Sequence, residues 1–407
     1  MLQFYILTVL LFFYIYSSPF MGLPTYISTI RITSAVFFLL FLFETLKKRK
    51  TKYHLVSKDI FKEVSRCVLL LLVYSFILLL TVGFGKGDHI YMTLINALLF
   101  STLVTIFLVR VYDSIDEFMK SLLLVTIIQS IFIWLCTFYP SFGQRLDSIF
   151  LYNYEHENLR ELSYAYGLAC TAAPGAIKYC LGLISCLYFY GKNKKVIYII
   201  LFIAFVLTGT MMARTSLIFG VMGLAIFPVI SGKRITIKNI LSVLIPLSVI
   251  CLLLFNLISN NANFFSEQFS RLLYLFDVGF NDAFLKFYLD GQNTVLPPIS
   301  SKTIIGTGIS SGLSENGVYV NTDGGYLKNY VALGLIASAL FYIKFFLSSI
   351  RLAFSYKCKA NKALMLFFVA YIFLAEFKEW VVFGMYLLCV FYTVAILLEK
   401  QEKLKSF

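Results

Sequence analysis

The chain has 407 residues, of which 59% are hydrophobic and only 14% are charged, and its mean hydropathy is +0.83. A soluble domain carries about 25% charged residues, and a chain of this length cannot bury so much apolar surface in one core. These values exclude an ordinary soluble protein and predict a helical membrane protein. The formal net charge of +14 has two readings, a nucleic-acid partner or membrane topology, and the positions of the charges decide between them.

About twelve apolar segments are long enough to cross a membrane, which takes ~20 residues in a helix. They are 2–20, 28–46, 67–84, 91–109, 120–138, 174–190, 196–212, 215–231, 239–258, 326–349, 363–377 and 380–398. We therefore expect an all-α, polytopic membrane protein with a single transmembrane domain over 1–407. The first segment is not expected to be a cleaved signal, because it lacks a basic start and a small-residue cleavage site.

Basic residues cluster in every second connection between these segments and in the C-terminal tail. The basic stretches are 47–66, 110–120, 192–195, 233–238, 351–362 and 400–405. They hold about two thirds of all lysine and arginine residues, a bias that marks the cytoplasmic side of a membrane protein. We expect both termini to be cytoplasmic, and because topology explains the basic excess, we expect no nucleic-acid partner.

This orientation leaves two long loops on the outer face, 139–173 and 259–325. Long connections without regular structure are more often functional or disordered than accidental, and both loops are too rich in aromatic and aliphatic residues to be disordered tails. Residues 271–289 have apolar positions at helical spacing. They predict a helix that lies along the membrane interface or, equally, a plain packing helix, so the second loop is expected to form a partly helical lid.

Three arginines stand in separate outer connections. Arg214 occupies a very short turn between two apolar spans, Arg160 lies in the first long loop, and Arg271 lies near the start of the second. Arginine binds phosphate oxygens with two parallel hydrogen bonds and never loses its charge. The three side chains could converge on one polyanionic group, or each could contact lipid headgroups separately.

Pro174 is well placed to begin the next helix, because a helix tolerates a missing N–H in its first turn. Helix N-termini attract anions, and Lys178 lies one turn further on. Arg145 and His156 are further candidates in the same loop. Both are more often ordinary loop residues, and His156 as a catalytic base is the less common outcome.

Asp323 closes the second long loop at the edge of the next span, where it could cap the helix or act as a general base. Lys328 follows within that span and is a further candidate. The AEFKEW turn, with Glu376, Lys378 and Glu379, could form an ion-paired plug or part of a polar cavity, and we favour the structural role.

The sequence offers no cofactor or metal site. No GxxxxGK[ST], HExxH or DxD motif is present, and no cysteine pair has CxxC spacing. All cysteines but Cys358 lie in apolar segments, which predicts small core residues rather than a disulfide framework.

Four stretches carry a recognisable pattern. RELSYAYGLACTAAPG (160–175) joins a loop arginine to a Gly/Pro helix entry, and LTGTMMARTSLIFG (207–220) is a span-ending arginine turn. SRLLYLF (270–276) precedes IIGTGISSG (304–312), and TDGGYLKNYVALGLIASAL (322–340) leads from the loop into a span. In order and spacing, they resemble the O-antigen polymerase (Wzy-type) and O-antigen ligase superfamily of bacterial membrane glycosyltransferases.

The resemblance implies a metal-independent, inverting glycosyltransferase without cofactors at the outer face of the bacterial inner membrane. It would transfer a growing glycan from undecaprenyl diphosphate to a hydroxyl of an incoming lipid-linked repeat unit. By motif position, Arg214 and Arg271 would grip the diphosphate, Arg160 would assist, and Asp323 would be the base. Membrane lipids and a chain-length regulator protein are further partners to consider.

Ligases of this superfamily carry a His-Asn pair where this chain has Thr322-Asp323, which favours a polymerase. The alternatives are an O-antigen ligase and a lipid-linked oligosaccharide flippase. Flippases usually have short outer loops and charges along the bundle interior, whereas Lys344 is the one obvious basic residue well inside a span here.

Overall fold

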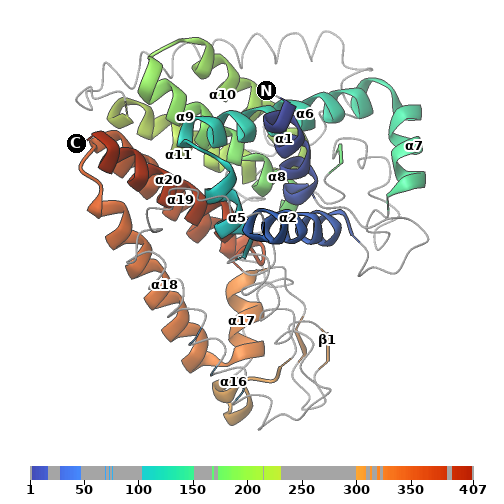
Figure 1. Ribbon diagram of the computed structural model, residues 1–407. Coiled ribbons are helices and arrows are strands. Elements are labelled where there is room, and N and C mark those ends of the chain that lie inside the picture. The colour runs from blue at the N-terminus through green and yellow to red at the C-terminus, as the bar shows by residue number, and fades with distance from the viewer. Residues whose placement is uncertain are drawn as a thin grey trace. The chain divides into compact units, whose positions relative to one another are not determined.

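The computed structural model describes residues 2–16, 28–46, 69, 73, 76, 103–150, 167–168, 173–213, 215–230, 299–308, 312–313, 319–320, 324–382 and 387–405. The described chain is mostly α-helical (Figure 1). It divides into two compact units, which are described separately below. The first comprises 1–36, 116–280 and 357–367, and the second 37–115, 281–356 and 368–407.

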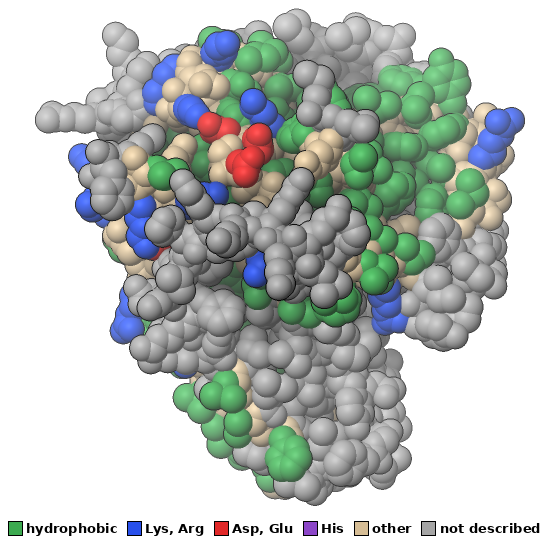
Figure 2. Space-filling model, in the orientation of Figure 1, with side chains coloured by type: hydrophobic (Ala, Val, Ile, Leu, Met, Phe, Trp, Pro, Cys, Tyr) green, Lys and Arg blue, Asp and Glu red, His purple; other side chains and the backbone are tan. Residues whose placement is uncertain are grey.

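Three of the described helices are long and apolar enough to cross a membrane: α6 (Ile115–Phe138), α18 (Leu335–Ser355) and α19 (Lys359–Lys378). Shorter apolar helices accompany them, and Figure 2 shows broad areas of hydrophobic side chains beside separate patches of charge. A helical membrane protein, as expected from composition, is the class that these helices support.

The first unit contains α1 (Leu2–Ile15), nearly all of α6, α7 (Pro140–Ile149), α8 (Ala173–Tyr179), α9 (Leu181–Asn193), α10 (Ile197–Met212) and α11 (Thr215–Ile230). Helices α8 to α11 pack against one another (Figure 1). Glycines permit the close approach of α10 and α11, because a Cβ on Gly220 would lie 2.7 Å from a methyl carbon of Val206. Helix α2 (Thr29–Leu46) is shared between the two units.

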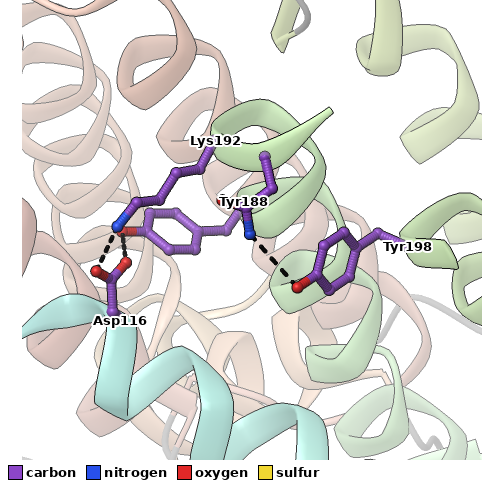
Figure 3. Close-up of polar contacts among 5 residues, drawn as sticks. Asp116, Tyr188, Lys192 and Tyr198 are labelled. Atoms are coloured by element: carbon purple, nitrogen blue, oxygen red, sulfur yellow. Dashed lines mark hydrogen bonds and ion pairs between the residues drawn. The ribbon is translucent and has the colours of Figure 1, made fainter. Parts of the chain in front are cut away.

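An acidic residue joins the first turn of α6 to the end of α9. Tyr188 donates a hydrogen bond of 2.7 Å to one carboxylate oxygen of Asp116, and Lys192 forms an ion pair with the other. Figure 3 shows both side chains reaching Asp116 from α9. At the end of α9, the Asn193 amide donates a hydrogen bond to the hydroxyl of Tyr198 on α10. An acidic group in the first turn also complements the partial positive charge of a helix N-terminus.

The second unit contains α5 (Val104–Val111), α16 (Ser301–Ile305), α17 (Gly325–Leu333), α18, the second half of α19 (368–378) and α20 (Leu387–Lys405), whereas the first half of α19 belongs to the first unit. A short antiparallel pair, β1 (Gly312–Leu313) with β2 (Tyr319–Val320), lies within the range expected to form the second long loop. Helix α20 packs on α5, and α16 packs on both α17 and α18 (Figure 1).

The connection between α18 and α19 is anchored by Tyr356, whose hydroxyl donates a hydrogen bond of 2.8 Å to the carbonyl of Ala395 on α20. Burial, with Glu399 and Glu402 nearby, raises the pKa of Tyr356 well above its usual value. The phenol therefore stays neutral and remains a donor. Cys358, two residues further on, is exposed.

Candidate functional site

Five of the proposed site residues, namely Asp323, Arg214, Arg271, Arg160 and His156, lie outside the described residues. So does most of the range 259–325, including the segment 271–289. Lys178, Arg145 and Lys328 are described. The site is therefore built from the elements that flank the undescribed positions.

The helix entry at Pro174 is confirmed, because α8 begins at Ala173 and Pro174 is its second residue. Lys178 lies in the last turn of this short helix and is 9% exposed. Arg145, by contrast, is exposed on α7. Helix α7 occupies ten residues of the range 139–173, which we expected to be a loop.

The very short connection expected at Arg214 agrees with its flanks, although Arg214 itself lies outside the described residues. Helix α10 ends at Met212 and α11 begins at Thr215, with Ala213 in an extended conformation between them. The helices meet closely here, since a Cβ on Gly209 would lie 2.6 Å from the hydroxyl oxygen of Ser216. The same hydroxyl lies 3.8 Å from the Cys180 sulfur.

A partly buried polar cluster lies between α6, α8 and α10. The hydroxyls of Ser130 and Tyr179 are 2.6 Å apart, and the Trp134 indole donates to the hydroxyl of Thr208 at 3.2 Å. Ser130, Trp134 and Thr208 also line an open, otherwise apolar pocket of about 360 Å³ between α6 and α10. Such a pocket can accommodate part of a hydrocarbon chain.

The most elaborate polar site in the described part of the chain is centred on Glu376, near the end of α19. Glu376 is fully buried, and both carboxylate oxygens accept hydrogen bonds. Val381 and Val382 donate their backbone N–H groups to Oε2 at 2.8 and 2.7 Å. The Tyr342 hydroxyl donates to Oε1 at 2.5 Å, and the Asn329 amide donates to it at 3.4 Å.

The donors around Glu376 are themselves held in place. The Asn329 amide also donates to the Tyr342 hydroxyl, and the Trp380 indole donates to the Asn329 carbonyl oxygen at 3.2 Å. Each of these contacts either donates a hydrogen bond to the carboxylate or holds one of its donors in place. This arrangement suits an ionised carboxylate, which can only accept hydrogen bonds. Hydrogen bonds to a charged group contribute about 1.5–3 kcal/mol each.

The first residue of α17, Gly325, lies directly against the Glu376 carboxylate. A Cβ on Gly325 would overlap the Glu376 carboxylate and would lie 2.9 Å from the carbonyl oxygen of Glu379. Lys328, in the second turn of α17, is close enough to act on Glu376 electrostatically. From the sequence we expect a structural role for Glu376, and its contacts hold the neighbouring segments in place.

The other end of α17 is held by residues 306–308, which belong to the range 259–325. Thr307 and Gly308 donate their backbone N–H groups to the carbonyls of Val331 and Ala332 at 2.9 and 3.0 Å. Gly306 and Gly334 both have positive φ, 107° and 89°. A side chain on either glycine would collide with the backbone of the other segment, so only glycine allows this crossing.

Neither the backbone crossing nor the donors of Glu376 were predicted. The AEFKEW turn marked Glu376 as noteworthy, but its partners come from α17, α18 and the following turn. The sequence signals that were available are the TDGG stretch (322–325), whose glycines allow close approach, and an acidic residue at the end of an apolar run.

These contacts can hold Gly306–Gly308, α17 and the buried Glu376 carboxylate in fixed positions relative to one another. A site that acts on a flexible substrate requires such fixed positions. Comparison with protein-family models gave no match, and comparison with curated proteins gave none either. The function of the chain is therefore argued from its own residues.

Proposed function

We propose that the protein is a polymerase of lipid-linked oligosaccharide repeat units, acting at the outer face of the bacterial inner membrane. The observation that supports it best is the way in which α17 is held at both of its ends. Gly306–Gly308, from the range 259–325, is bound to one end of α17, and Glu376 lies against the other end. A transfer reaction needs such fixed positions, since a misplacement of about 1 Å can cost ~10²-fold in rate.

In the proposed topology about twelve helices cross the membrane and both termini are cytoplasmic. The ranges 139–173 and 259–325 then face outward. Asp323 and Arg271 belong to the second of these ranges, Arg160 belongs to the first, and Arg214 lies in a short turn on the same side. The three described long helices and the apolar α10 and α11 are consistent with this arrangement.

The proposed reaction is a single displacement. The acceptor hydroxyl oxygen attacks the anomeric carbon of the growing glycan, and the bond from that carbon to the diphosphate oxygen breaks. Asp323 takes the proton of the hydroxyl, while Arg214 and Arg271, assisted by Arg160, bind the departing diphosphate. The products are a glycan one repeat unit longer, with inverted anomeric configuration, and undecaprenyl diphosphate.

Two substitutions test the diphosphate clamp. Arg214→Ala and Arg271→Ala should each abolish long-chain glycan on gel electrophoresis while protein abundance stays unchanged, because the leaving group loses its charge partner. Arg351→Ala is the matched control: Arg351 is exposed near the end of α18, in a connection assigned to the cytoplasm. Normal chain lengths in either clamp variant would refute the clamp.

One observation favours a transporter instead. Glu376 is a fully buried carboxylate within a candidate membrane-spanning helix, and such groups often belong to transport pathways. Its contacts weaken this reading, because Val381, Val382, Tyr342 and Asn329 already occupy both of its oxygens. A polymerase remains the better account, and an O-antigen ligase is the alternative within the enzyme class.

A further inference from the structure

Two consecutive helices, α17 and α18, and the turn that follows α19 meet at the Glu376 carboxylate. Asn329 comes from α17, Tyr342 comes from α18, and Val381 and Val382 come from the turn after α19. The carboxylate is thus the common acceptor of a helix side chain, a second helix side chain and two consecutive backbone amides. Removing it would leave four buried donors without their acceptor, so the carboxylate fixes all three segments together.

The segment most directly fixed is the first turn of α17. Gly325 approaches the carboxylate so closely that any side chain there would overlap it. In the sequence, α17 is entered directly from the long loop through Thr322, Asp323 and Gly324. The opposite end of α17 is bound to Gly306–Gly308. The entry of the chain into α17 and the attachment of Gly306–Gly308 to its other end therefore both depend on the position of this nine-residue helix.

A purely structural role does not account well for the choice of residue. A buried charge is costly to desolvate, and well-packed apolar side chains often replace one without loss of stability. Within a membrane-spanning helix the cost is higher still. A buried carboxylate that fixes the loop exit is understandable when the exact placement of that exit matters to a reaction.

We propose that Glu376 is a positioning residue of the glycan transfer, acting through the first turn of α17 rather than by contact with substrate. This inference rests on the proposed function. It assigns to Glu376 an effect on the rate of transfer, with little effect on the binding of the lipid-linked substrate.

The test uses the full chain purified in lipid nanodiscs, with a synthetic undecaprenyl-diphosphate-linked repeat unit as substrate. Glu376→Gln keeps the size of the side chain but turns an NH2 group toward donors, whichever way the amide lies. We expect kcat to fall about 10²-fold, as for a misplaced reacting group, while KM stays within about twofold.

Two further variants separate position from charge. Glu376→Asp keeps the charge but draws the carboxylate back by one methylene, so its kcat should be reduced as in Glu376→Gln. Tyr342→Phe removes a single donor, and we expect kcat to fall about tenfold. The matched control is Tyr356→Phe, which also deletes a buried tyrosine hydroxyl bond but lies outside the Glu376 network and should leave kcat unchanged.

The outcomes are distinguishable. A wild-type protein that makes no polymer overturns the proposed function and this inference with it. An active wild type with an equally active Glu376→Gln variant overturns the inference alone, as does a Glu376→Asp variant at wild-type rate. If Glu376→Gln does not accumulate in the membrane, Tyr342→Phe decides: a lowered kcat at unchanged KM supports the inference, and a wild-type kcat refutes it.

Discussion

At the scale of single residues, one acidic side chain joins separate segments of the chain in each of the two units. Asp116 holds α9 to α6, and Glu376 holds three segments around one carboxylate. They differ in burial, because Glu376 is inaccessible whereas the Asp116 side chain is 28% exposed. Water competes for Asp116 and not for Glu376, so the same kind of contact should contribute less to stability at Asp116.

The two partners of Asp116 should not be equal in energy. Tyr188 is buried, and Tyr188→Phe removes a hydrogen bond to a charged group, which should lower the free energy of unfolding by about 1 kcal/mol. The Lys192 side chain is 44% exposed, so Lys192→Met should change it by less than about 0.5 kcal/mol. Thermal unfolding in detergent measures both variants, and a larger loss for Lys192→Met would contradict this ranking.

The residue scale is also where sequence reasoning reached least far. The acidic residues of AEFKEW draw attention to this turn, but no local pattern identifies Asn329 or Tyr342 as partners of Glu376. Those contacts depend on how α17, α18 and α19 pack, which a single sequence does not encode locally. Lys178 was considered for the charge of its side chain, and the structure adds that it is almost fully buried.

At the scale of elements, hydropathy located most of the described helices well. Segments predicted at 196–212 and 215–231 correspond to α10 (Ile197–Met212) and α11 (Thr215–Ile230). The reason is that membrane spans need continuous apolar runs, and charged or polar residues end them. Segments 67–84 and 239–258 fall almost wholly or wholly outside the described residues.

Hydropathy did not predict where a continuous apolar run is broken. The segment 326–349 is two helices, α17 and α18, separated at Gly334 with its positive φ. Likewise, 174–190 is divided at Cys180 into α8 and α9. A break in the backbone leaves the average hydropathy unchanged, so only the backbone geometry reveals it. The Gly334 break matters most, because the Gly306–Gly308 segment binds there.

Helix α7 is the reverse case, an element found where a loop was expected. The signal was present in the sequence: Pro140 begins the helix at a position that proline favours, and Phe142, Leu146 and Ile149 stand at helical spacing. Its low hydropathy excluded it from a search for membrane spans, and it was therefore counted as part of the loop.

At the scale of the whole molecule, the proposed orientation places the α18–α19 connection in the cytoplasm. Cys358 in that connection is exposed, whereas the other described cysteines, Cys136, Cys180, Cys186 and Cys389, are buried. A membrane-impermeant maleimide should label Cys358 only after the inner membrane is permeabilised, and a Cys358→Ser variant supplies the background. Ser301→Cys, at an exposed position in the proposed outer loop, should be labelled without permeabilisation. The reverse pattern would contradict the orientation.

The most direct test of the central claim is the glycan ladder of a strain that lacks this chain. A polymerase account predicts surface glycan with a single repeat unit, and long chains should return when the wild-type chain is restored. Unattached lipid-linked polymer would instead indicate a ligase, and the absence of any surface product would indicate a flippase. Either of these results, or a normal ladder without the chain, would contradict the account.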